Sequence, residues 1–215
     1  MEIESNYRNT CQKFWRDIKK SDPTEITAVR TVSYNSDTRQ FIVLFFNEEY
    51  VVDSDQEIIR RRRDGYVPEV LATIIILNYL ANARPFLGSD VNWVSIKELP
   101  GGMIFYSAFH KTVISVLIES FGHQSSRLME VSHVLDGKPG PFGDASVILR
   151  AFPEIPLCVV IWEGDEEVNP NATILYDSSI GQILDTGISI DLGVYLAKEL
   201  KKLAQGQFSK YITET

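Results

Sequence analysis

Eight almost wholly apolar residues, IPLCVVIW at 155–162, restrict the possible folds of this chain more than any other segment. In a strand, Cys158, Val160 and Trp162 share one face, and the residues between them make the other face apolar as well. A strand that is apolar on both faces is typical of the middle of a sheet with covered faces. We therefore expect a central strand at this position.

Two groups of strand-like segments alternate with helical ones along the chain. The first group is predicted near 29–35, 40–46 and 49–53, and the second at 145–152, 157–162 and 173–177. Helical patterns precede, separate and follow these groups. The order indicates an α+β fold, with antiparallel strand meanders packed against several helices, rather than a doubly wound parallel sheet. The pattern leaves open whether the two meanders form one mixed sheet.

Helical periodicity and capping signals set the expected helices. They are predicted over 1–20, 68–83, 105–121, 125–136, 178–184 and 191–206. Asp177 is the expected N-cap of the short helix at 178–184, and Asp191 is the expected N-cap of the last helix.

The 215 residues are 44% hydrophobic and 23% charged, which is the balance of an ordinary folded protein. A chain of this length can bury a core without disulfides. We therefore expect a single α+β domain over residues 1–215. The helix over residues 1–21 is a candidate peripheral element, and a ragged end is expected over residues 206–215.

The net charge of -8 argues against nucleic acid as a partner. Residues 60–63 form a run of four arginines, and acidic residues on both sides of the run weaken its field. A solvated surface loop is the expectation for this run, and a phosphate or partner contact is the alternative. No apolar run is long enough to span a membrane, and the N-terminus lacks the features of a signal peptide, so no membrane partner is expected.

The two cysteines, Cys11 and Cys158, lie far apart in the sequence and belong to no C-x-x-C pair. Cys158 falls within the expected central strand, whereas Cys11 falls in a helical pattern. A disulfide between them is not expected, and a cytoplasmic location fits best.

Four carboxylates follow the central strand within five positions: Glu163, Asp165, Glu166 and Glu167. Crowded carboxylates can bind a hard cation, or one can act as a general acid when its neighbours raise its pKa. No calcium-loop pattern and no histidine at ligand spacing accompanies them. A solvated hairpin turn is therefore the simpler interpretation.

The segment LPGG at 99–102 places Gly101 and Gly102 directly before a helix, where backbone N–H groups could contact an anionic ligand. It lacks the spacing of a phosphate loop, so a tight turn is the alternative. His110 follows among aromatic residues and is either a site residue or a partly buried helix histidine.

Other site patterns are weak. Four aromatic residues could line an apolar pocket or fill the core: Trp93, Phe105, Tyr106 and Trp162. No serine or cysteine nucleophile motif is present.

Taken together, LPGG at 99–102, FPEIPLCVVIWEGDEEVNPNATILYD at 152–177 and the strand-rich start resemble an uncharacterised prokaryotic family, the domain of unknown function numbered 3786. The resemblance covers about residues 25 to 205, and the family typically shows a phenylalanine in place of Tyr176. Members come largely from anaerobic bacteria and archaea, and some resemble fusions to iron-sulfur modules of the kind found with corrinoid proteins. This chain lacks the cysteine cluster of those fusions.

The resemblance implies a link to corrinoid or iron-sulfur cofactor metabolism, without implying a reaction. It also marks Trp162, Asp165, Glu166 and Asp177 as residues of a family hallmark. No resident cofactor follows from it.

Three functions are consistent with these patterns. The first is a non-catalytic ligand-binding or accessory domain, with a small-molecule pocket between the LPGG turn and the acidic strand end. The second is an enzyme that pairs His110 with a carboxylate among Glu163, Asp165 and Glu166, with a divalent cation. The third is an interaction module that binds an iron-sulfur or corrinoid partner protein.

Overall fold

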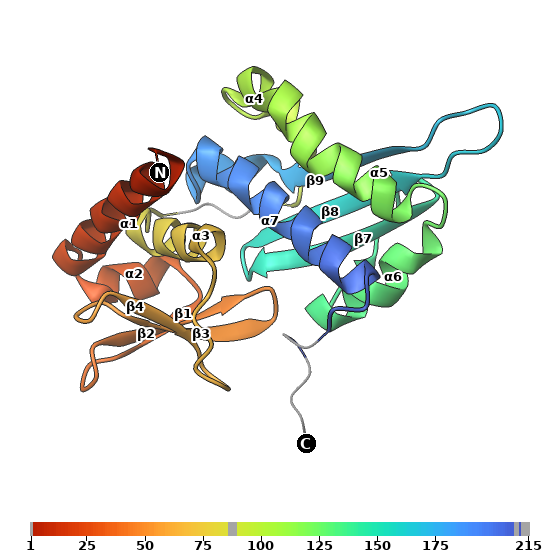
Figure 1. The fold of residues 1–215 in the computed structure, drawn as a ribbon. Coiled ribbons are helices and arrows are strands. Elements are labelled where there is room, and N and C mark those ends of the chain that lie inside the picture. Colours follow the sequence, from red (N-terminus) through yellow and green to blue (C-terminus); the bar gives the residue numbers. More distant parts are fainter. Residues whose placement is uncertain (1, 86–89, 209–210, 212–215) are drawn as a thin grey trace.

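Two antiparallel sheets and the helices between them make up the computed structural model of the chain (Figure 1), which describes residues 2–85, 90–208 and 211, with side chains from residue 7 onwards. The first sheet has the order β1-β2-β3-β4 and contains β1 (Val32–Asn35), β2 (Gln40–Phe45), β3 (Glu48–Asp53) and β4 (Ile58–Arg61). Phe46 and Asn47 form the turn between β2 and β3 and both have positive φ, at 45° and 62°. This is the backbone that a tight two-residue hairpin requires.

The second sheet has the order β5-β9-β8-β7-β6, so β8 is its central strand, as predicted. Its strands are β5 (Trp93–Ser95), β6 (Lys138–Pro139), β7 (Ala145–Phe152), β8 (Ile155–Trp162) and β9 (Asn171–Asp177). Every residue of β8 except Trp162 is buried. The two meanders are therefore separate sheets, and the Phe46 N–H joins them by donating to the Ala151 carbonyl at 2.9 Å.

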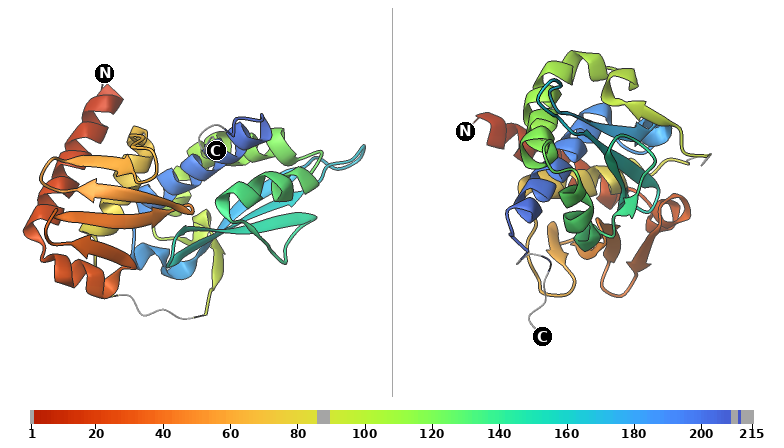
Figure 2. Two further views of the ribbon diagram at one scale, coloured as in Figure 1. Left: turned by 90° about the horizontal axis from the view of Figure 1, so that it is seen from below. Right: turned by 90° about the vertical axis from the view of Figure 1, so that its right-hand side faces the viewer.

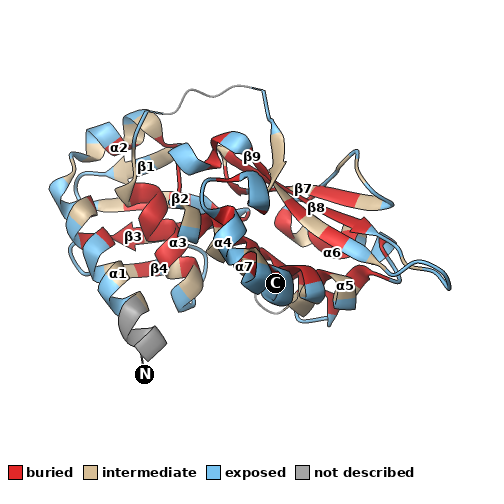
Figure 3. Ribbon diagram, turned by 90° about the horizontal axis from the view of Figure 1, so that it is seen from above, coloured by how far each residue is buried: buried red, intermediate tan, exposed pale blue. Residues whose placement is uncertain are grey.

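Helices cover the sheets and fill the space between them. They are α1 (Glu2–Lys20), α2 (Pro23–Val29), α3 (Val70–Ala81), α4 (Gly102–Phe109), α5 (Ser115–Phe121), α6 (Ser126–Ser132) and α7 (Thr186–Ala204), with the 3-10 turns η1 (Ile96–Glu98), η3 (His133–Leu135) and η4 (Ser178–Gln182) and the π-helical turn η2 (His110–Ile114). Figure 2 shows α5, α6 and α7 on one face of the five-stranded sheet. Helix α3 contacts both α1 and α7 and is buried along most of its length (Figure 3). The α+β prediction is confirmed.

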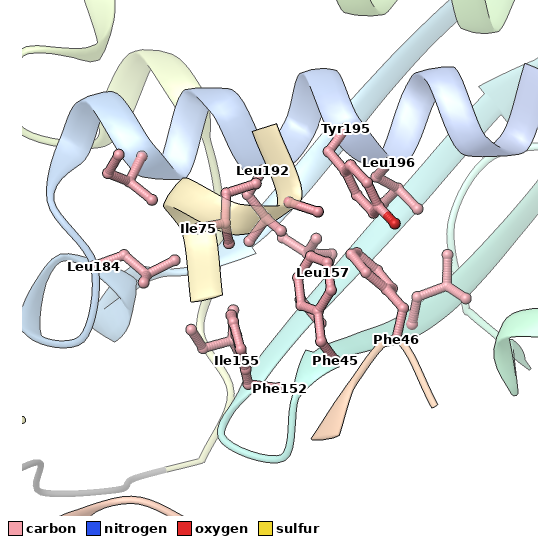
Figure 4. Close-up of a cluster of buried hydrophobic side chains, with 14 of the residues drawn as sticks. Phe45, Phe46, Ile75, Phe152, Ile155, Leu157, Leu184, Leu192, Tyr195 and Leu196 are labelled. Atoms are coloured by element: carbon pink, nitrogen blue, oxygen red, sulfur yellow. The ribbon is translucent and has the colours of Figure 1, made fainter. Parts of the chain in front are cut away.

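Aromatic rings form the part of the core where the two sheets meet α3 and α7 (Figure 4). Phe152 stacks on Tyr79 with a centroid distance of 3.9 Å and lies 5.0 Å from Phe45. Phe45 in turn lies 5.1 Å from Tyr195 of α7. A continuous aromatic cluster therefore connects β2, β7, α3 and α7.

Two helix starts differ from the sequence prediction. Helix α2 occupies residues that were expected to precede or begin a strand, because Asp22 caps it by accepting the Thr24 N–H at 2.8 Å and Pro23 suits a first helical turn. Helix α7 begins at Thr186, after Asp185, so the prediction that Asp191 caps it is wrong. The Asn78 amide binds the Asp185 carboxylate at 2.8 Å and stabilises the earlier start.

The arginine run is only partly a solvated loop. Arg61 lies at an inward position of β4, is 3% exposed, and pairs with Asp64 at 2.6 Å. Arg62 and Arg63 form salt bridges to Glu49 and Glu48 of β3. The prediction of a solvated loop is therefore wrong for Arg61, whose charge is neutralised by one of the flanking acidic residues.

Candidate functional site

The acidic residues after β8 lie in the hairpin that joins β8 to β9. The Glu163 carboxylate accepts the Ser125 backbone N–H, and the Asp165 carboxylate accepts the N–H groups of Glu167 and Val168 at 2.8 and 2.7 Å. These hydrogen bonds lower the pKa of both carboxyl groups, so both stay ionised at neutral pH. The contacts of Glu163 and Asp165 are those of a turn.

Glu166 and Trp162 lie in the same part of the hairpin, and both are exposed. Over residues 2–85, 90–208 and 211, no group of three or more His, Cys, Asp or Glu side chains is placed to hold a metal ion.

The glycines of LPGG are required by local geometry. Gly101 is left-handed with φ of 77°, and Gly102 donates its N–H to the Leu99 carbonyl at 2.9 Å. A Cβ at Gly102 would lie 1.7 Å from the Ile96 carbonyl oxygen, so only glycine fits there. Asp177 caps η4 as predicted, by accepting the Ser179 N–H at 2.8 Å.

The structure does not bring the predicted site residues together. Helices α4, η2 and α5 run without interruption from Gly102 to Gly122, and the Gly122 carbonyl accepts the Gly164 N–H of the acidic hairpin at 3.0 Å. At 1.5 Å of rise per residue, the LPGG turn is about 30 Å from this hairpin, and His110 is about 18 Å from it. Asp177 ends β9 at its far end, about 20 Å from the hairpin by strand length.

A cleft lies elsewhere and is lined by residues of α1, α3, α4 and α7, helices that are labelled in Figure 1. It contains two cavities, of about 620 Å³ and about 740 Å³. Tyr7 of α1 and Asp191 of α7 line both cavities, so they mark the boundary between them. Phe105 of α4 lines the smaller one, as the only member of the predicted aromatic set among its lining residues.

Asp191 is the chemically distinctive residue of the cleft. Its carboxyl group is partly buried, and burial raises its pKa to about 6, with Lys198 acting in the opposite direction. Within the described part of the chain, no hydrogen bond or salt bridge reaches this carboxyl group. Asp191 and burial together raise the pKa of Tyr7. An unpartnered carboxyl group at a cavity is available to a ligand.

Two further residues line the larger cavity from other elements. Burial raises the pKa of the Cys11 thiol, so most of it is protonated at neutral pH and it reacts more slowly as a nucleophile than an exposed thiol does. Thr112 comes from the π-helical turn η2, a geometry that is frequent at functional sites.

A third cavity, of about 820 Å³, lies beside α2 and β1 and is larger than either, but its charged groups are already satisfied. The Arg30 guanidinium donates to the carbonyls of Tyr79, Asn82 and Arg84, at 3.3, 2.7 and 3.2 Å. The Glu154 carboxylate accepts the Tyr79 hydroxyl at 2.6 Å and the Thr31 N–H at 2.6 Å. These contacts stabilise the end of α3, and they occupy the polar groups of Arg30 and Glu154 that a ligand would otherwise bind.

Sequence reasoning missed the cleft, although one signal was present. Asp191 lies between Ile190 and Leu192 in α7, and an acidic residue flanked by apolar residues in a helix needs an explanation. Its interpretation as a helix cap removed that signal. Tyr7 falls at the helical spacing of the apolar residues in the first helix, so its sequence position gave no separate signal of a binding site.

Replacing Asp191 by asparagine should raise the free energy of unfolding at about pH 8 by about 1 kcal/mol, a value discounted for partial exposure. Burial raises the pKa of Asp191 from 3.8 to about 6 in the folded protein, so the fold binds this proton more tightly than the unfolded chain does. The stability that the protonated form contributes is therefore full below about pH 4 and is lost as the pH rises through about 6.

Urea unfolding of Asp191→Asn and of the unchanged protein at about pH 4 and about pH 8 measures this effect. The matched control is Asp165→Asn, because hydrogen bonds lower the pKa of Asp165 and its substitution should lower stability at the higher pH. An Asp191→Asn gain that is equal at both pH values would contradict the prediction.

The fold and the cleft define an α+β protein with two antiparallel sheets and a ligand-sized space walled by helices. The family model described as Domain of unknown function (DUF3786) matches residues 22–199. The chain belongs to this family, which confirms the resemblance found in the sequence. Helix α1 precedes the matched residues.

No curated protein and no solved structure matches the chain. Among the described helices, none has the length and apolar character needed to cross a membrane.

Proposed function

We propose that this protein is a non-catalytic ligand-binding domain whose ligand occupies the cleft between α1, α3, α4 and α7. The observation that carries the proposal is Asp191, an ionisable group without a hydrogen-bond or salt-bridge partner in the described structure, at the boundary of two cavities. A carboxyl group in this setting gains a partner when a ligand with a hydrogen-bond donor or acceptor enters.

The size and lining of the cleft support this function. Each cavity, at about 620 and about 740 Å³, has the size of an ordinary small-molecule site. Side chains such as Phe14, Ile74 and Ile188 supply apolar surface, and polar side chains such as Lys13 and Asp191 lie beside them. Apolar walls with polar groups that can fix a ligand's orientation are typical of ligand sites.

The proposal includes a cytoplasmic location and a role in the corrinoid or iron-sulfur cofactor metabolism of anaerobes. The free thiols of Cys11 and Cys158 support a reducing compartment. The family resemblance supports the metabolic context. We do not propose the acid-base enzyme, because His110 is about 18 Å along the helix from the acidic hairpin and acid-base partners must reach the same substrate.

Cys11 provides a built-in test of the cleft. It lines the larger cavity, whereas Cys158 is fully buried in β8, so N-ethylmaleimide should label one thiol per folded chain. A panel of flavin, nicotinamide, corrinoid and nucleotide cofactors would be screened by thermal shift on protein purified without oxygen. We expect a binder to slow Cys11 labelling at least about fivefold, because it occupies the same space.

In the Asp191→Ala variant, the binder should no longer protect Cys11 from labelling. Asp165→Asn in the acidic hairpin is the control, in which the binder should still protect Cys11. A binder that protects Cys11 equally in Asp191→Ala, or binds without any protection, would refute the assignment of the cleft.

One observation favours a second function, the interaction module. Met103, Ile104 and Phe105 in the first turn of α4 are 66%, 81% and 46% exposed, which is unusual for three consecutive apolar residues. An iron-sulfur or corrinoid partner protein would bury this turn. Ile104→Asp should then weaken binding of such a partner at least about tenfold without changing the unfolding transition. Equal binding of the partner by Ile104→Asp and by the unchanged protein would exclude the first turn of α4 as the binding surface.

A further inference from the structure

Both cavities of the cleft combine apolar and charged side chains in their walls. In the smaller one, apolar side chains from α1 (Phe14), α3 (Ile74), α4 (Phe105) and α7 (Ile188) are joined by Lys13, Asp185 and Asp191. In the larger one, Val70, Leu71 and Val194 are joined by Arg8, Glu69, Asp191 and Lys198. A ligand that occupies both cavities therefore has an apolar part and a polar part.

Two exposed cations line the larger cavity from different elements. Arg8 comes from α1 and Lys198 from α7, and within the described structure neither forms a salt bridge or a side-chain hydrogen bond. The carboxyl groups that line this cavity are Glu69 and Asp191. Lys198 acts on Asp191 only as a nearby charge, without direct contact. Two cations without an ion-pair partner in the described structure, one on α1 and one on α7, suit an anionic group between them.

Resting on the proposed ligand-binding function, we propose that the ligand is an amphipathic anion. Its apolar body occupies the cavity beside Phe105 and Ile188, and its anionic group lies between Arg8 and Lys198. Asp191, at the boundary, donates a hydrogen bond to the ligand when its carboxyl group is protonated.

Ligand binding is then coupled to proton uptake. Because the pKa of Asp191 is about 6, the group is neutral below that pH and repels an anion above it. Several titratable or charged groups share the cleft with Asp191: Tyr7, Arg8, Cys11 and Lys13 on α1, Glu69 before α3, and Asp185 and Lys198 on or beside α7. Asp185 already binds Asn78. The pKa of Asp191 is thus the one expected to set the pH dependence between about pH 5 and about pH 7.5.

A matched pair of fluorescent probes tests the charge of the ligand. 8-Anilinonaphthalene-1-sulfonate carries a permanent sulfonate, and N-phenyl-1-naphthylamine has the same rings without it. We expect the sulfonate probe to bind more tightly than the neutral probe near pH 5.5, and to weaken about threefold to tenfold by about pH 7.5. The neutral probe should show little pH dependence. Both probes should slow Cys11 labelling, which places them in the cleft.

Three variants assign the effect to residues. Arg8→Gln and Lys198→Gln should each weaken the sulfonate probe at least about fivefold and leave the neutral probe unchanged. Asp191→Asn should remove the pH dependence of the sulfonate probe. Arg16→Gln, an exposed position further along α1, is the control that should change neither probe.

The outcomes separate this inference from the proposed function. If the neutral probe binds and protects Cys11 but the sulfonate gives no advantage, the anionic class is wrong and the cleft remains a ligand site. If neither probe binds nor protects Cys11, both this inference and the proposed function are overturned. Equal loss of both probes in Arg8→Gln and Lys198→Gln would also overturn the anionic class.

Discussion

Replacing Phe152 by alanine is expected to lower the free energy of unfolding by about 3 to 5 kcal/mol, the usual cost of truncating a fully buried phenylalanine. Phe152 is 1% exposed, and its ring stacks on Tyr79 and contacts Phe45. It therefore holds the end of β7 against both α3 and the four-stranded sheet. Removing the ring leaves a cavity at the junction of three elements.

Guanidinium unfolding followed by tryptophan fluorescence measures the loss. Met103→Ala, at a position 66% exposed, is the matched control and should change stability by less than about 0.5 kcal/mol. Hydrogen exchange adds a local readout, since the Phe46 amide bonds to Ala151 next to the substituted residue and should exchange faster. A Phe152→Ala loss below about 1 kcal/mol would show that the sheets are not joined through this ring.

Replacing Gly193 by alanine is expected to cost about 2 to 3 kcal/mol through overpacking. A Cβ at this position of α7 would lie 2.3 Å from the Tyr176 hydroxyl and 2.8 Å from Phe109. Tyr176 is fully buried, and its hydroxyl has no hydrogen-bond partner in the described structure. Tyr176→Phe should therefore raise stability by about 1 kcal/mol because it removes an unsatisfied buried group.

The double variant tests whether these two effects share one cause. Because the hydroxyl is the atom nearest to the added methyl group, Tyr176→Phe should recover at least about 1 kcal/mol of the Gly193→Ala loss beyond simple additivity. Gly187→Ala is the control in the same helix, since nothing lies within 4 Å of its added Cβ, and it should be neutral or stabilising. Strict additivity of the two changes would contradict the proposed clash.

Much of the fold could be predicted because its signals are local. Continuous apolar sequence identified β8 as a central strand, and β-branched and aromatic residues identified the strands on either side. The end of the helix predicted over 105–121 and the N-cap at Asp177 were also correct, since caps depend on neighbouring residues.

The misses have different physical causes. Strand β4 contains Arg60 and Arg61, and the ion pair between the buried Arg61 and the exposed Asp64 makes a charged segment acceptable in the sheet. Asp64 is close to Arg61 in sequence, but the arginine run alone does not show which of its side chains points inward. The start of α7 depends on Asn78, which is 107 residues away from Asp185 in sequence and is not visible in a window of neighbouring residues.

The candidate site was less predictable than the fold. The acidic hairpin and the LPGG turn were conspicuous in composition, but the structure explains most of their residues by turn geometry. The cleft instead combines single residues from four helices, and no spacing rule connects Tyr7 to Asp191. Its residues share a location only after the helices pack.

Helix α1 has a consequence for how much of the chain the cleft needs. It supplies Tyr7, Arg8 and Cys11 to one wall of the cleft, yet it lies before the residues that match the family, whereas Asp191 and Val194 of α7 lie within them. Residues 22–199 by themselves therefore build only part of the cleft, and the helix that precedes them completes it.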